Sequence, residues 1–161
     1  MEITPYVTTG AIRAALGVTE NEVGDEALAE QMLDVALLAD LSSLAPEHEA
    51  IFDEAQAEGA SEQTRQRARL MTLFCLWHCV ANVADSWLAF PNRISDGKSE
   101  MARSLDVKTL REISERAASR RDGWRARFIE FETSISQGTP QSTVPGLVSI
   151  SVPGYDPVTD S

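Results

Sequence analysis

The stretch "MTLFCLWHCVANVADSW", residues 71–87, decides the fold of this protein. It belongs to an apolar run of fifteen residues, 70–84, that is interrupted by His78 and Asn82. A membrane-spanning helix needs about 20 consecutive apolar residues, so this run is too short and too polar to cross a bilayer. Because it is apolar on nearly every side, it predicts a helix enclosed by the other helices of a bundle or by neighbouring subunits.

Capping residues and helix breakers divide the rest of the chain into further helices around this one. The predicted helices, with the residues that bound them, are 10–16 (Thr8 or Thr9, Gly17), 26–45 (Asp25), 46–58 (Pro46, Gly59), 62–90 (Ser61, Pro91) and 105–135. The predicted core face of the second is Leu28, Met32, Val35, Ala36 and Ala39, and that of the last is Val107, Leu110, Ile113, Ala117, Trp124, Phe128 and Phe131. The sequence therefore predicts an all-α fold, a helical bundle of about four to five helices around a long central apolar helix.

The central helix also carries two cysteines and a histidine, which raises the question of a metal site. Cys75 and Cys79 are four residues apart and would share a helix face, but a closed zinc site needs four ligands. His78 points to another side, and His48 is the only other histidine in the sequence. We therefore expect buried, inert cysteines and a core histidine. Since nucleophile-elbow, phosphate-loop and HExxH motifs are also missing, we predict no catalytic residues, no cofactor and no metal.

Charge is unevenly distributed along the chain, whose net charge is −11. Residues 1–62 hold fourteen Asp/Glu and one basic residue, Arg13, whereas residues 63–137 hold thirteen Lys/Arg and nine Asp/Glu. So acidic a protein is a poor candidate for gripping nucleic acid, because its field repels a polyanion. The opening "MEITPYVTTG" has no signal-peptide pattern, so we expect a cytoplasmic protein at synthesis.

The last predicted helix is rich in arginine, and the acidic first third is its electrostatic complement. Two arrangements remain open: the two regions meet inside one subunit, or the acidic face of one copy meets the basic helix of the next in a contact that closes into a ring. In the second arrangement, the subunit-interface residues are Arg111, Arg116, Arg120, Arg121, Arg125 and Arg127 with Glu26, Glu30 and Asp34.

The C-terminal end differs in composition from the rest. Four prolines lie between residues 140 and 157, which excludes helix and separates an extended arm, residues 138–161, from a helical domain, residues 1–137. In the arm, "LVSISV" alternates like a strand that has no partner in its own chain. The arm is either a disordered end or a segment that orders on a partner by strand addition. Its expected partner-binding residues are Leu147, Val148, Ser149, Ile150, Ser151, Val152 and Tyr155.

Two segments, "AALGVTENEVGDEAL" at residues 14–28 and "RISDGKSEMAR" at residues 93–103, are the most specific features of the sequence. With them come a short first helix, a central apolar helix, an arginine-rich helix and an extended tail. This layout, over residues 3–135, resembles the head-tail connector adaptors of long-tailed bacteriophages.

The resemblance implies a structural virion protein of the neck, assembled in the host cytoplasm. Such subunits form a ring, usually twelvefold, between the portal protein and the head-closure or tail proteins, and the ring extends the DNA channel without sequence-specific binding. The C-terminal segment of these adaptors commonly docks on the portal, although the tail of this chain is longer and more strand-like. Another neck or tail-completion protein and a non-phage helical interaction module remain as alternatives.

Overall fold

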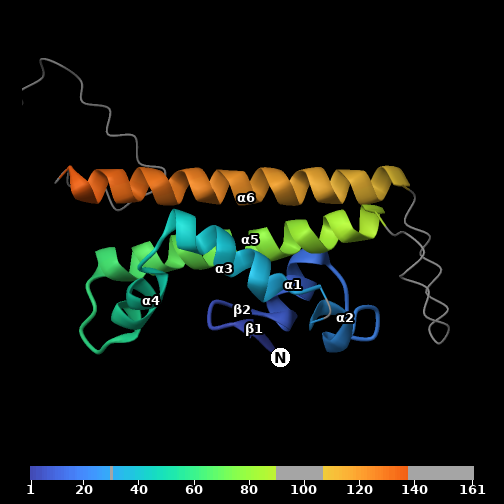
Figure 1. Cartoon of the computed structure of the whole chain (residues 1–161), viewed down its shortest axis with the longest axis horizontal. Coiled ribbons are helices and arrows are strands. Elements are labelled where there is room, and N and C mark those ends of the chain that lie inside the picture. The colour runs from blue at the N-terminus through green and yellow to red at the C-terminus, as the bar shows by residue number, and fades with distance from the viewer. Residues whose placement is uncertain (30, 90–106, 138–161) are drawn as a thin grey trace, which may run out of the picture.

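Two long antiparallel helices organise the molecule (Figure 1). The computed structural model describes residues 1–29, 31–89 and 107–137. The central apolar segment forms α5, Glu62–Ala89, and the arginine-rich segment forms α6, Val107–Ser136, which lies along α5. The other elements are β1 (Glu2–Thr4), β2 (Val7–Thr8), α1 (Thr9–Leu16), α2 (Asp25–Ala29), α3 (Leu33–Leu44) and α4 (His48–Gln56). Of these, β2, α1, α3 and α4 contact α5. The predicted all-α helical bundle is confirmed, with a small two-stranded hairpin added to it.

α5 is enclosed on several sides, as its sequence predicts. It begins after Ser61, whose Oγ accepts the backbone N–H of Thr64 at 3.0 Å and so caps the helix. α6 packs along one side of α5, while α1, α3 and α4 contact others. Its buried positions include Met71, Phe74, Cys75, Cys79, Val80, Ala81 and Val83. The apolar surface of residues 71–87 is therefore covered largely by helices of the same chain.

α1 begins and ends where the sequence predicts, but a hairpin precedes it. Thr8 caps α1 by accepting the N–H of Ala11 at 3.2 Å, and Gly17 ends it with a left-handed φ of 74°. The hairpin pairs β1 with β2 in antiparallel fashion and places Tyr6 and Val7 in the core. Strands this short carry too little alternating pattern to be predicted from sequence.

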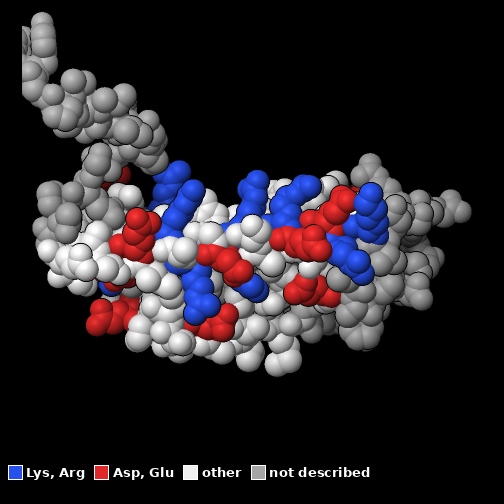
Figure 2. All heavy atoms as spheres, turned by 90° about the horizontal axis from the view of Figure 1, so that it is seen from above, with Lys and Arg blue, Asp and Glu red and all other residues white. Residues whose placement is uncertain are grey.

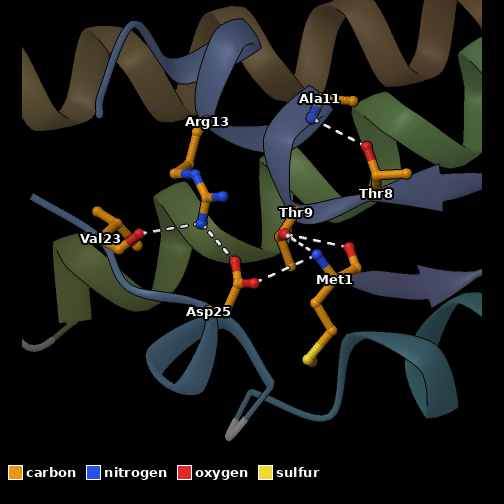
Figure 3. A network of polar contacts seen from close by, with 7 residues as sticks. All are labelled: Met1, Thr8, Thr9, Ala11, Arg13, Val23 and Asp25. Carbon is orange, nitrogen blue, oxygen red and sulfur yellow. Dashed lines mark hydrogen bonds and ion pairs between the residues drawn. The ribbon is translucent and has the colours of Figure 1, made fainter. Parts of the chain in front are cut away.

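A charged network ties the N-terminal segment to the chain that follows (Figure 3). Arg13 donates to Asp25 at 2.6 Å and to the carbonyl oxygen of Val23 at 3.3 Å. The Met1 ammonium donates to Asp25 and to Thr9 Oγ1, each at 3.2 Å. The hydrogen bond from Arg13, helped by those from Thr9 and the ammonium, holds the pKa of Asp25 well below its usual range. Asp25 thus binds Arg13 instead of acting as the predicted helix cap.

The single helix predicted at residues 26–45 is wrong, because the chain forms two helices there. α2 ends at Ala29, and α3 begins only after Met32. Met32 has a φ of 49°, in the left-handed region that residues other than glycine rarely adopt. This turn reorients the chain, so the two helices do not share one continuous face.

The break changes which side of α3 is buried. Its buried side chains are the leucines Leu33, Leu37 and Leu41. Of the predicted stripe Leu28, Met32, Val35, Ala36 and Ala39, the structure buries Leu28 alone. Burying leucines removes more apolar area from water than burying alanines, and this favours the observed register.

α6 presents the apolar stripe that its sequence predicts from Leu110 onward, and the side chain of Val107 lies outside the described residues. Leu110, Ala117, Phe128 and Phe131 are buried, and Ile113 and Trp124 are half-buried. Arg67 of α5 makes two hydrogen bonds to the Glu132 carboxylate, at 2.5 and 2.7 Å, across the helix pair. Gly123 lies inside α6 without interrupting it.

α4 is shorter than predicted at both ends. It begins at His48, after a turn that contains Pro46, and it ends at Gln56, before Gly59 turns the chain with a φ of 84°. The segment at residues 93–103 singled out in the sequence, the interface residue Glu30 and the entire C-terminal arm lie outside the described residues.

Candidate interaction surfaces

The cysteines of α5 are structural residues. Cys75 and Cys79 are both fully buried in the core. Burial raises the pKa of both thiols, to about 12 for Cys79, so neither forms a thiolate near neutral pH. In the described part of the chain, no group of three or more His, Cys, Asp or Glu side chains is placed to hold a metal ion.

His78 is a core histidine between α5 and α3. The Asn82 amide donates to Nε2 at 2.9 Å, which leaves the proton of the neutral ring on Nδ1. Nδ1 lies 3.2 Å from a carboxylate oxygen of Asp40 but without hydrogen-bond geometry, so we regard the contact as weak. Desolvation lowers the pKa of His78, against an opposing effect of Asp40. The imidazole is therefore neutral near pH 7 and serves packing.

The arginines of α6 lie on the outside of the molecule with few acidic partners. Figure 2 looks onto the α6 side and shows Lys and Arg along it, with Asp and Glu between them. Arg121 pairs with the adjacent Asp122 at 2.9 Å. Among the described residues, no acid forms an ion pair within 4.0 Å with Arg111, Arg116, Arg120, Arg125 or Arg127. The described acidic residues of the first third therefore do not cover the basic helix within one subunit.

Two of these arginines border a groove between α1, α5 and α6, which we call the arginine groove. Its volume is about 270 Å³, and its lining includes Leu16, Trp77, Val80, Ile113, Arg116 and Arg120. The Arg120 guanidinium lies 4.7 Å from the centre of the Trp77 ring, in a cation–π contact. Small-molecule sites usually enclose about 300–1,000 Å³, so this groove is better suited to a few side chains of another protein. Its lining is apolar except for the positively charged side chains of Arg116 and Arg120.

α3 carries an apolar surface of its own on the side that faces solvent. Met32, Val35 and Leu38 recur at three-residue steps and are 62%, 53% and 39% exposed. Asp34 is exposed on the same helix. We call these four residues the α3 face. A helix that is apolar on both sides is typical of one covered on both sides, yet the described residues cover only one.

The structure brings together part of the predicted subunit interface. Arg116 and Arg120 share the groove, whereas Arg127 stacks on Trp124 of the same helix with 4.6 Å to the ring centre. Glu26 and Asp34 are exposed on α2 and α3 and form no ion pair with the described arginines of α6.

Sequence reasoning missed both the apolar lining of the groove and the α3 face. The signal for the α3 face was present in "LDVALLADLSSL", residues 33–44, which is apolar on more than one side. The groove had no local signal, because its lining comes from three separate helices.

Comparison of the chain with known proteins finds no similar protein. No protein-family model, no curated protein and no solved structure matches the chain. Within residues 1–29, 31–89 and 107–137, no helix has the length and apolar character needed to reach across a bilayer. The function is therefore inferred from the residues and their geometry.

Proposed function

We propose that this protein is a structural adaptor of a bacteriophage head-tail connector. In this role, copies of the chain form a ring between the portal protein and the head-closure or tail proteins, and the ring extends the DNA channel. The observation that carries the proposal is the pair of exposed, chemically complementary surfaces on a helical body: the arginine groove and the α3 face. Such surfaces serve protein contacts and require no reactive centre.

The buried polar groups support a role without catalysis. Cys75 and Cys79 have raised thiol pKa values and lie in the core, and His78 is buried and neutral. An active site needs titratable groups that converge on an accessible cleft. The arginine groove contains two arginines instead, with no base or nucleophile in its lining.

The charge of the chain supports passage of DNA, not capture. A net charge of −11 repels the phosphate backbone, and the cations of α6 are interspersed with acids instead of forming one continuous basic field (Figure 2). A channel wall of this kind lets DNA slide. The order of elements, from the short first helix through the central apolar helix to the arginine-rich helix, also agrees with the resemblance to connector adaptors.

The proposed mechanism couples a preformed helical body to a C-terminal arm. The body provides the ring, and residues 147–152 add a strand to the portal with Tyr155 as an anchor. In this mechanism the arm becomes ordered only when it binds the portal. The conformational entropy of the arm is therefore lost only in the complex.

The proposal is tested by sedimentation of the purified protein with portal rings of the same phage. The full chain is expected to sediment with the portal, and deletion of residues 138–161 is expected to leave a folded protein that no longer does. In the full chain, Val148→Asp/Ile150→Asp should weaken binding more than the matched pair Ser149→Asp/Ser151→Asp, which alters the other side of the strand. Binding by the truncated protein would refute the role of the arm. A full chain that neither binds the portal nor occupies the neck of the virion in cryo-electron microscopy would refute the adaptor proposal.

A further inference from the structure

We infer that the arginine groove of one copy receives the α3 face of a second copy, so that subunits join head to tail. The inference rests on the proposed function in taking a ring as the finished assembly. The contact itself is argued from two surfaces of this chain.

The first step is the match in shape and polarity. The lining of the groove includes the apolar side chains of Leu16, Trp77 and Ile113. On the α3 face, Val35 and Leu38 are three residues apart, so their side chains are neighbours on one ridge about 5–6 Å apart. A ridge of this kind fits a groove of about 270 Å³, and docking would remove both apolar surfaces from water.

The second step is the match in charge. Arg116 and Arg120 border the groove and have no acidic partner within 4.0 Å among the described residues. Asp34, beside Val35, is exposed on the α3 face. Docking the ridge therefore brings a carboxylate to two guanidinium groups that form no ion pair with the described residues, one of which, that of Arg120, stacks on Trp77. Such complementarity selects the partner and its orientation.

The third step is that an α3 face in the groove belongs to another copy. α3 packs against its own body through Leu33, Leu37 and Leu41, which turns the α3 face outward. The groove is formed by α1, α5 and α6, without any residue of α3. Since the two surfaces share no residue, the contact is heterologous. Each subunit then offers one free groove and one free face, and repeated addition closes into a ring when the rotation allows it.

Analytical ultracentrifugation of the full chain tests the contact. Wild-type protein is expected to associate as its concentration rises. Val35→Asp/Leu38→Asp and, separately, Arg116→Glu/Arg120→Glu should each weaken self-association by about tenfold or more. Arg111→Glu/Arg125→Glu is the matched control, because it makes the same charge change on α6 outside the groove lining. Circular dichroism verifies that every variant is folded.

Mixing the two weakened variants gives the sharpest outcome. Each retains one intact surface, so an equimolar mixture should form heterodimers that do not grow further. If the groove variant still self-associates while the α3 variant does not, the contact is a symmetric one through α3 and the inference is wrong. Absence of the heterodimer in the mixture also refutes it.

Disulfide trapping detects self-association that is too weak for ultracentrifugation. It also tests the contact without the charge substitutions, which could unfold the protein. Copies carrying Leu38→Cys and copies carrying Ile113→Cys are expected to cross-link when mixed, whereas Gln56→Cys in place of Leu38→Cys should not. If neither cross-links nor association are found, the groove is not a self-association site. Portal sedimentation is measured on the same proteins: portal binding without the heterodimer refutes this inference alone, and the heterodimer without portal binding refutes the proposed function alone.

Discussion

Leu37 and Leu38 are adjacent leucines of α3 for which the structure predicts opposite sensitivities to the same substitution. Leu37 is 0% exposed in the core, whereas Leu38 is 39% exposed on the α3 face. Truncating a fully buried leucine to alanine removes its packing and leaves a cavity, which costs about 2–5 kcal/mol of unfolding free energy. A substitution at a largely exposed position usually changes stability by about 0.5 kcal/mol, so we expect Leu38→Ala to cost about 1 kcal/mol or less.

Urea and thermal denaturation, both followed by far-ultraviolet circular dichroism, measure this difference at a concentration where the wild type is monomeric. For a chain of this size, 1 kcal/mol corresponds to roughly 2–4 °C in Tm. A loss of about 3 kcal/mol in Leu37→Ala would therefore lower Tm by roughly 6–12 °C. Intrinsic helix propensity does not confound the comparison, because both variants replace leucine with alanine.

The refuting result is equal destabilisation by the two variants, or a larger loss in Leu38→Ala. Either would mean that α3 buries another side and that the break at Met32 is misplaced. A large loss on Met32→Ala would point the same way, since the continuous helix expected from sequence placed that side chain in the core.

Three further predictions concern α5 and α6. Gly123→Ala should raise the unfolding free energy by about 0.5–1 kcal/mol, because an added Cβ meets nothing within 4 Å and glycine is the poorer helix former; Ala126→Gly should lower it by a similar amount in the same denaturation assay. The pKa of His78 is lowered from 6.5 in the folded protein, so the unfolded chain binds the proton first and stability should fall as the pH drops through 6.5. As the pH drops through 6.5, the urea midpoint should fall less in His78→Gln than in wild type. An equal fall in both proteins would contradict the lowered pKa of His78. Cys75 and Cys79 should resist iodoacetamide in the native protein and react in urea, as read by mass spectrometry; rapid native labelling would mean that α5 is not enclosed.

Much of the helical frame could be predicted from short stretches of sequence. Thr8 and Ser61 cap α1 and α5 through side-chain bonds that reach three residues along the chain, and Gly17 ends α1 by adopting a left-handed backbone. These signals are local, because the partner of each group lies within one helical turn. The enclosure of α5 was also readable, since a helix that is apolar all round must be covered.

The candidate site was predicted only in part. The charge pattern left open whether the acidic first third meets the α6 arginines inside one subunit, and the answer depended on where that third folds. The single arginine of the acidic first third, Arg13, donates a hydrogen bond to Asp25 of the same region across a loop. The groove brings Leu16, Trp77 and Ile113 together from helices far apart in the chain, so no spacing in the sequence marks it.

The sequence alone therefore determined that the chain forms helices, where α1 begins and ends, where α5 begins, and that α5 is buried, because caps and periodicity act within a few residues. The tertiary structure alone decided which side of α3 faces the core and which arginines border a groove. Residues 33–44 are apolar on more than one side, so local pattern does not choose between the sides. Packing against the rest of the chain makes that choice by burying three leucines, and it leaves Val35 and Leu38 exposed.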